Sequence, residues 1–417
     1  MEPTHDDHAR PPGDRPSGPP PRPSSPPASP PGPGSHTGQA PAPGLFTRRR
    51  ALFGLGAIGL VAVSAGVTVL TRDEGSPSRV EGADPAEPGV GATTSATSPA
   101  PIRPWRGDVA GGEKAAPAVG GGLVFANGGD DLHAFEATTG VLKWRAPAGE
   151  TRFTSPAVAA GTVYSHGGSV YAFDAATGAP KWKVAMDNSS WPVATSDTVY
   201  VSDGGTLHAL EAAGGRTRWS FPAGDRTFHP PVVVDARVYA SNGDGLYALD
   251  AATGSGKWRF ADAVESPPVT AGRIVAGYAQ SIAENTSMAV FGLDAASGER
   301  VWSHPIAGEG AGITATDRAV FVTFDTTVTA LAAETGALLW EASVPATGAP
   351  IVSGDTVYVT AGDTLVALDA GTGAPRWTFA TGAGGEGSPP VIAAGAAYFQ
   401  CGGALYAVDA ASGAGPA

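Results

Sequence analysis

The sequence predicts an all-β fold, an eight-bladed β-propeller of four-stranded blades whose ring is closed by an N-terminal strand. Three observations predict it. Tryptophans recur about every forty residues over 105–417, a glycine and an acid stand at fixed distances before them, and 59 glycines and 38 prolines accompany only 16% charged residues. This composition is typical of a turn-rich β-protein and argues against a helical bundle.

The tryptophan repeat sets the length of the structural unit. Seven tryptophans are separated by 38, 37, 39, 44, 38 and 37 residues, and an eighth stands 39 residues before the first of them. Each is expected to wedge between neighbouring blades, because burying roughly 150–250 Å² of ring surface is strongly stabilising. We therefore interpret all eight as structural: Trp105, Trp144, Trp182, Trp219, Trp258, Trp302, Trp340 and Trp377.

The segment before each of the last seven tryptophans is typical of a β-hairpin. A glycine stands four residues before the tryptophan and an acid four residues before the glycine, with Ala332 as the exception, so the unit reads LYALDAxTGxxxW. The acid can cap the turn backbone, and glycine supplies a left-handed conformation. Two short strands upstream, such as 155–158 and 161–164, bring each unit to four strands, which is one propeller blade.

Counting the units predicts how the ring closes. An eighth apolar run with its acid, 404–409, is followed by Ser412 and Gly413, but the position of its tryptophan is occupied by Ala417. Trp105 stands outside any complete unit, so the strand 105–109 is expected to complete the last blade. A closed ring removes exposed sheet edges, and deleting 105–109 is therefore expected to destabilise it.

The chain before the repeats divides into three zones. Residues 1–46 are rich in proline and are expected to form a disordered cytoplasmic tail, because they cannot bury enough apolar surface to offset the entropy of ordering. Residues 47–70 contain three arginines and then the uncharged run 51–70, which is long enough to cross a membrane as a helix. Residues 71–104 are interpreted as a flexible linker.

The segment 47–70 has two interpretations. Its arginines and apolar run are similar to a twin-arginine export signal, with a small-residue cleavage site at 63–65, or the segment remains as a single-pass anchor. The positive-inside rule places residues 1–50 in the cytoplasm and the repeats outside it. We expect a propeller held at the cell membrane, or a secreted propeller if the signal is cleaved.

Charge and motif content exclude several classes of function. A net charge of −13, from 26 basic and 39 acidic residues, disfavours binding to nucleic acid. Cys401, the single cysteine, fits a small buried strand residue better than a nucleophile, and the histidines lack metal-ligand spacing. The sequence contains no GxSxG, HExxH or phosphate-loop motif. We therefore expect no enzymatic activity, no cofactor and no metal.

The repeated unit, as in 171–182 (YAFDAATGAPKW) and 247–258 (YALDAATGSGKW), resembles the pyrroloquinoline-quinone (PQQ)-type propeller repeat over essentially all of 105–417. That family includes quinoprotein alcohol dehydrogenases, which bind PQQ and Ca²⁺ on the propeller axis, the noncatalytic propeller of the outer-membrane assembly machinery, and sensor domains of membrane kinases. The dehydrogenases carry an adjacent Cys-Cys disulfide and long insertions. A single cysteine and short gaps make the noncatalytic propeller the better likeness.

Function is expected where one blade departs from the repeat. The segments leading into blades 2, 3 and 4 carry aromatic and charged residues near a proline, and they should cluster at one mouth of the central channel. The candidate interface is Arg152, Phe153, Asp187, Trp191, Arg226 and Phe228. The alternative is that these rings only plug the channel. The long hairpin at 277–287 is interpreted as a recognition loop or as sequence drift without a function. The missing acid at Ala332 is interpreted as neutral variation.

These features predict a noncatalytic, membrane-tethered, extracytoplasmic propeller that is a monomer and acts as a protein-interaction scaffold. A second hypothesis is a sensor that binds a small ligand in the axial channel, and a third is a PQQ-dependent oxidoreductase. An axis filled by side chains favours the scaffold. An open pocket lined by Arg152, Trp191 and Arg226 favours ligand binding.

Overall fold

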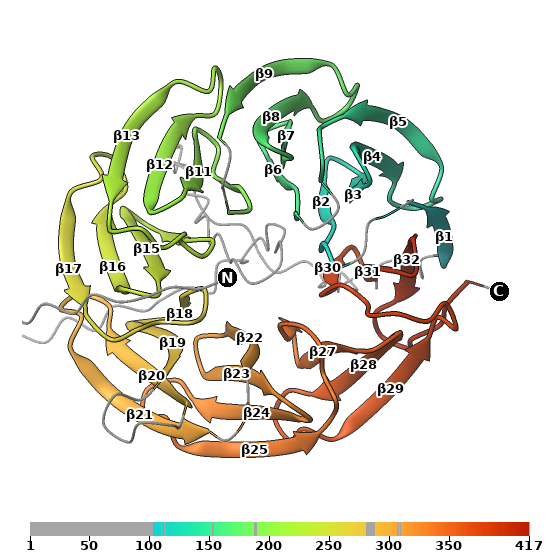
Figure 1. Ribbon diagram of the computed structural model, residues 1–417. Helices are drawn as coiled ribbons and strands as arrows, with labels where there is room; N and C mark the ends of the chain where they lie inside the picture. The colour runs from blue at the N-terminus through green and yellow to red at the C-terminus, as the bar shows by residue number, and fades with distance from the viewer. Residues whose placement is uncertain are drawn as a thin grey trace, which may run out of the picture. The chain divides into compact units, whose positions relative to one another are not determined.

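The structure is a computed structural model that describes residues 103–109, 111, 114–151, 154–186, 190–280, 288–306, 308 and 310–416. These residues form eight four-stranded antiparallel sheets, arranged as blades around a ring, and contain no helix (Figure 1). The predicted tail, the predicted membrane segment and residues 71–102 lie outside the described residues. No described element is long and apolar enough to cross a membrane as a helix.

Each blade runs from a short strand near the axis to a strand at the outer rim (Figure 1). The first four blades contain β2 (Ala118–Gly120), β3 (Leu123–Gly128), β4 (Asp131–Glu136) and β5 (Leu142–Pro147); β6 (Ala157–Ala159), β7 (Thr162–His166), β8 (Ser169–Asp174) and β9 (Pro180–Ala185); β10 (Val193–Ala194), β11 (Thr198–Asp203), β12 (Thr206–Glu211) and β13 (Thr217–Pro222); β14 (Val232–Val234), β15 (Arg237–Asn242), β16 (Gly245–Asp250) and β17 (Gly256–Phe260).

The remaining four blades follow the same order, with one exception. They contain β18 (Val269–Ala271), β19 (Ile274–Gln280), β20 (Met288–Asp294) and β21 (Arg300–Ile306); β22 (Gly310–Ala315), β23 (Ala319–Phe324), β24 (Thr327–Ala332) and β25 (Leu338–Ser343); β26 (Ile351–Ser353), β27 (Thr356–Ala361), β28 (Thr364–Asp369) and β29 (Pro375–Ala380); β30 (Val391–Ala393), β31 (Ala396–Cys401), β32 (Ala404–Asp409) and, out of sequence order, β1 (Trp105–Asp108).

The hairpin turns use the acids as predicted. In blade 7, Asp369 Oδ1 accepts hydrogen bonds from the backbone N–H of Thr372 at 2.9 Å and from its hydroxyl at 2.8 Å. Arg376 donates to the same carboxylate at 2.7 Å, and these contacts lower the pKa of Asp369 to about 2. The acid therefore fixes the turn and accounts for part of the negative charge without forming a site.

The tryptophans join successive blades, as predicted. Each indole Nε1–H donates to a backbone carbonyl in the next blade, for example Trp302 to Ala333 at 2.8 Å. The ring lies against the turn glycine of that blade: a Cβ on Gly336 would be 2.5 Å from the Trp302 ring, and Gly336 has a φ of +67°. The turn glycine is thus required both by its own backbone conformation and by the neighbouring indole.

The ring closes through β1, as the unit count predicts. Four residue pairs join β1 to β32, from Trp105 opposite Ala407 to Asp108 opposite Ala404. Trp105 Nε1 donates to Ala137 O of blade 1 at 2.8 Å, and the Tyr398 hydroxyl of blade 8 donates to the same carbonyl at 3.1 Å. The first described strand therefore locks the last blade onto the first.

Candidate binding site on the propeller axis

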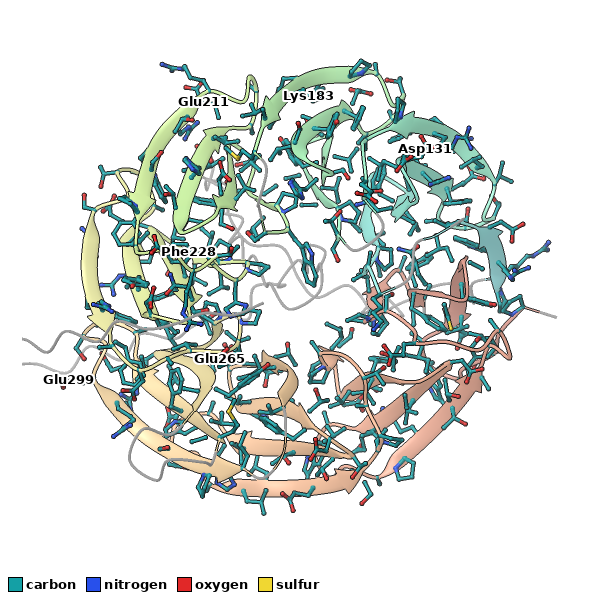
Figure 2. All side chains as sticks on the ribbon, viewed as in Figure 1. Asp131, Lys183, Glu211, Phe228, Glu265 and Glu299 are labelled. Carbon is teal, nitrogen blue, oxygen red and sulfur yellow. The ribbon has the colours of Figure 1, made fainter. Side chains whose placement is uncertain are left out.

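An open cavity of about 500 Å³ lies on the propeller axis. It is lined from seven of the eight blades, mainly by the segments that lead from one blade's outer strand to the next blade's innermost strand. The lining residues are Lys114, Trp191, His229, Pro230, Glu265, Pro267, Tyr278, Gly312, Ile313, Thr347, Gly348, Ala349, Glu386, Gly387 and Pro389. In Figure 2, Glu265 lies toward the centre of the ring, whereas Glu211 and Glu299 lie at its outer rim.

The size of Trp191 is exceptional for its place in the repeat. Trp191 stands two residues before Val193, the first residue of β10. The register of the β-ladders makes this position equivalent to Ala116 in blade 1 and Ala349 in blade 7. The other blades have serine, proline or glycine there. Trp191 is therefore the largest side chain at this position of the repeat.

Two carboxylates reach the cavity from opposite parts of the ring. Glu386, in the segment leading into blade 8, forms an ion pair with Lys114 at 2.6 Å, which ties that segment to the one leading into blade 1. Glu265, in the segment leading into blade 5, forms no hydrogen bond or ion pair through its side chain with the described residues, and it is exposed. Among the described lining residues, Glu265 is therefore the carboxylate that has no ion-pair partner.

The backbone around Glu265 is fixed by an additional strand pairing. Val264 forms an isolated antiparallel bridge with Ala279, and the Glu265 N–H donates to Tyr278 O at 3.0 Å. The Tyr278 N–H donates to Ser266 Oγ at 3.0 Å. Tyr278 itself is buried and its ring meets Phe324 edge-on at 5.5 Å. The carboxylate is thus presented from a rigid wall.

Two titratable neighbours of Glu265 stay neutral near neutral pH. Burial lowers the pKa of His229 below its ordinary value, although the charge of Glu265 opposes this shift. Burial, assisted by Glu265, raises the pKa of Tyr278 to about 12. Neither group adds charge to the cavity at pH 7, so the charges of its described lining are those of Lys114, Glu265 and Glu386.

A ring of buried polar side chains holds the axial segments in place, and sequence reasoning missed it. These side chains stand near the end of each blade's second strand, and several donate to carbonyl groups of the next blade's axial segment. The donors and acceptors are Asn127 to Thr154 at 2.6 Å, Ser202 to Phe228 at 3.4 Å, Ser241 to Ser266 at 2.6 Å, Thr323 to Gly348 at 3.0 Å and Gln400 to Ala115 at 2.7 Å. The sequence signal for this ring is a polar residue that stands two positions after the buried aromatic residue of each of these second strands.

The predicted interface residues do not all gather at the cavity. Trp191 lines it, whereas Arg226 is exposed and pairs with Asp244 at 3.9 Å without lining it. Phe228 is only 1% exposed and packs between blades 3 and 4 against Phe221 and Tyr247, so its ring is part of the core and does not line the cavity. The other three, Arg152, Phe153 and Asp187, lie outside the described residues.

The described lining does not fit PQQ with Ca²⁺. PQQ carries several carboxylates, whereas the cavity has two glutamates and one lysine that is already paired. No group of three or more His, Cys, Asp or Glu side chains in the described part of the chain is arranged to hold a metal ion. Cys401 is fully buried in β31, as predicted, and the Thr381 hydroxyl lies 3.5 Å from its sulfur.

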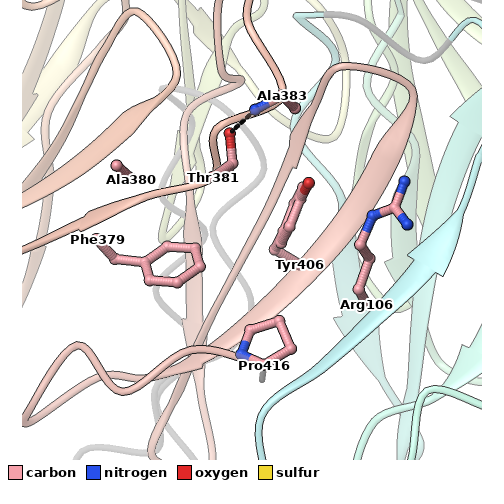
Figure 3. Close-up of a pocket in the computed structure, with 7 residues that line it drawn as sticks. All are labelled: Arg106, Phe379, Ala380, Thr381, Ala383, Tyr406 and Pro416. Carbon is pink, nitrogen blue, oxygen red and sulfur yellow. Dashed lines mark hydrogen bonds between the residues drawn. The ribbon is translucent and has the colours of Figure 1, made fainter.

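A second pocket, of about 430 Å³, lies where the ring closes (Figure 3). Its lining is Arg106, Phe379, Ala380, Thr381, Ala383, Tyr406 and Pro416. The Arg106 guanidinium lies 5.9 Å from the Tyr406 ring centre, and similar cation–π pairs join Lys183 to Tyr171 and Arg259 to Tyr247. Because these pairs recur in other blades, they are part of the repeat and do not mark this pocket as a site.

The fold and the axial cavity define an eight-bladed propeller built from PQQ-type repeats. The chain belongs to the family described as outer membrane protein assembly factor BamB, whose model matches residues 102–189, 166–323 and 290–415. Among curated proteins, none matches the chain.

Solved structures share the fold at low sequence identity. BamB from Moraxella catarrhalis is 18% identical, with a TM-score of 0.59 over 74% of this chain and 98% of that one. The computationally designed Ika8 protein is 17% identical, with a TM-score of 0.61 over 72% and 98%. A quinohemoprotein alcohol dehydrogenase from Pseudomonas putida HK5 is 13% identical, with a TM-score of 0.53 over 76% and 77%.

Proposed function

We propose that this protein is a noncatalytic, extracytoplasmic protein-interaction scaffold, tethered to the membrane through residues 51–70, whose partner docks at the axial mouth. One observation carries the proposal: an open cavity whose lining includes the indole of Trp191. Aromatic residues in partly open pockets are typical anchors of protein interfaces. Family membership supports a noncatalytic role, since the matching family is described as an assembly factor.

A sensor for a small extracytoplasmic ligand is the second candidate function. The open cavity favours it, because about 500 Å³ lies within the range of small-molecule sites. The two candidates differ in what fills the cavity. Native mass spectrometry of the protein purified from its own membrane distinguishes them, since a co-purifying small molecule that is lost with Trp191→Ala supports the sensor.

The scaffold is tested by recovering partners from membranes with the wild-type chain and with Trp191→Ala. Alanine stands at the equivalent position in two blades, as Ala116 and Ala349, so this substitution leaves the fold intact. Leu339→Ala is the matched control, because Leu339 is 52% exposed on the outer strand β25, away from the cavity. We expect partner recovery to fall with Trp191→Ala alone. Unchanged recovery would reject the axial mouth as the docking site.

Tethering is tested by cell fractionation. The full chain is expected in the membrane fraction, resistant to washing with high salt or carbonate, and accessible to protease from outside the cytoplasm. Deleting 51–70 should abolish membrane association. A propeller released into the medium by the full chain would instead favour the cleaved signal.

A further inference from the structure

We infer that the axial cavity accepts a basic side chain, an arginine or lysine carried on an extended segment of the partner protein, with Glu265 as its counter-ion. This inference rests on the proposed function, because it names what the partner inserts at the same mouth. Three features of the cavity carry it: its charge, its walls and the fixed backbone that carries the Glu265 carboxylate.

The charge of the described lining favours a cation. Glu386 is neutralised by Lys114 at 2.6 Å, whereas Glu265 has no ionic partner among the described residues. His229 stays neutral near neutral pH because burial lowers its pKa. The described lining therefore keeps one negative charge, in a concave site where a partner would exclude water and strengthen the attraction of that charge for a cation.

The walls suit the long stem of a basic side chain. Trp191 and Tyr278 supply aromatic surface, and Pro230, Pro267 and Pro389 add apolar, conformationally rigid surface around the axis. Arginine and lysine bury an aliphatic stem along such surface, and a guanidinium stacks on aromatic rings while donating to a carboxylate. A hydrophobic side chain would leave Glu265 desolvated and unpaired, which is unfavourable.

The backbone that carries the Glu265 carboxylate is fixed before a ligand binds. The bridge between Val264 and Ala279 and the hydrogen bonds that join Glu265 and Ser266 to Tyr278 fix its backbone before anything binds. The Ser241 hydroxyl donates to Ser266 O at 2.6 Å and ties the same segment to blade 4. Little backbone ordering remains to oppose binding, which favours the affinity gained from one charged contact.

The test selects linear heptapeptides from a random display library on the purified full chain. The inference predicts enrichment of arginine or lysine at one position. Binding of an enriched peptide should weaken at least roughly tenfold with Glu265→Gln, because the neutral amide removes the charge that strengthens the hydrogen bond to the basic group. The control Glu299→Gln, an exposed glutamate at the outer rim in Figure 2, should leave the affinity unchanged.

The outcomes separate this inference from the proposed function. Peptides that need Trp191 but contain no basic residue, or that ignore Glu265→Gln, overturn the inference and leave the scaffold standing. A failure to enrich any peptide counts against it as well. Free arginine methyl ester binding as tightly as the enriched peptide would identify a small-cation site and overturn the assignment to a partner segment. If Trp191→Ala leaves partner recovery from membranes unchanged, the axial mouth is rejected as the docking site of the scaffold.

Discussion

Truncating Trp105 tests whether the ring is closed. Trp105 is 7% exposed and its ring lies against Gly140, where a Cβ would be 2.5 Å from it. Burial of roughly 150–250 Å² at about 25 cal/mol per Å² gives about 4–6 kcal/mol as an upper estimate, and Trp→Ala changes in cores cost about 3–5 kcal/mol. Ala137 O keeps the Tyr398 hydroxyl as a donor, so no carbonyl is left unpaired. We therefore expect Trp105→Ala to lower the free energy of unfolding by about 3–5 kcal/mol.

The matched comparison is Trp377→Ala in blade 7. Trp377 Nε1 donates to Ala410 O at 3.2 Å, and that carbonyl also accepts from the Tyr358 hydroxyl at 3.0 Å, so the two sites share the same hydrogen-bond pattern. Urea unfolding followed by far-UV circular dichroism gives both free energies without relying on tryptophan fluorescence. A closed ring requires similar losses at both sites.

One result would refute the eight-bladed closure. If Trp377→Ala costs several kcal/mol and Trp105→Ala costs less than about 1 kcal/mol, the seam between β1 and β32 contributes nothing in solution. Deleting 105–109 should then be harmless too. With a closed ring, the deletion removes four ladder pairs and the indole together, and it exposes an edge of β32 that promotes aggregation.

Three further predictions concern single positions. Gly336→Ala should lower the free energy of unfolding in urea by more than about 2 kcal/mol, because the added Cβ meets the Trp302 ring. The control is Gly354→Ala, where φ is +60° and no atom lies within 4 Å of the added Cβ. Only the backbone conformation opposes this change, which should cost about 1–2 kcal/mol. Burial lowers the pKa of His166 in the folded state, so the unfolded chain takes up this proton first and stability falls as the pH drops below about 6.5. His166→Asn should therefore reduce the loss of stability between pH 7 and pH 5. Ala332→Asp should restore the turn cap that the other blades have. It should increase the free energy of unfolding by about 1 kcal/mol, which a higher melting temperature would show.

The fold was predictable because its information is local and repeated. Most hairpins contain an acid, a turn glycine and a tryptophan within nine residues, so the unit, the blade count and the closing strand follow from spacing alone. The spacing did not predict which tryptophan packs against each turn glycine. Gly336 packs on Trp302 of the preceding blade and not on Trp340 of its own unit, and only the three-dimensional ring brings these residues together.

The site was predictable only in part, because side-chain direction in the axial segments depends on tertiary contacts. Trp191 was found by comparing blades, and it lines the cavity. Phe228 was taken from the same comparison, but it stands two positions before the slot equivalent to Trp191 and turns into the core. Glu265 and Glu386 were missed, although the same comparison would have shown an acid shortly before the Ser-Pro-Pro of blades 5 and 8.

The axial segments can vary in chemistry because the repeat fixes their backbone by other means. Most of them end in a proline, which has no backbone N–H to satisfy, and the buried polar ring binds their carbonyl groups from the preceding blade. The side chains that face the axis can therefore differ from blade to blade. Trp191 and Glu265 line the cavity at such positions, whereas the Glu386 side chain pairs with Lys114 and joins the segments that lead into blades 8 and 1.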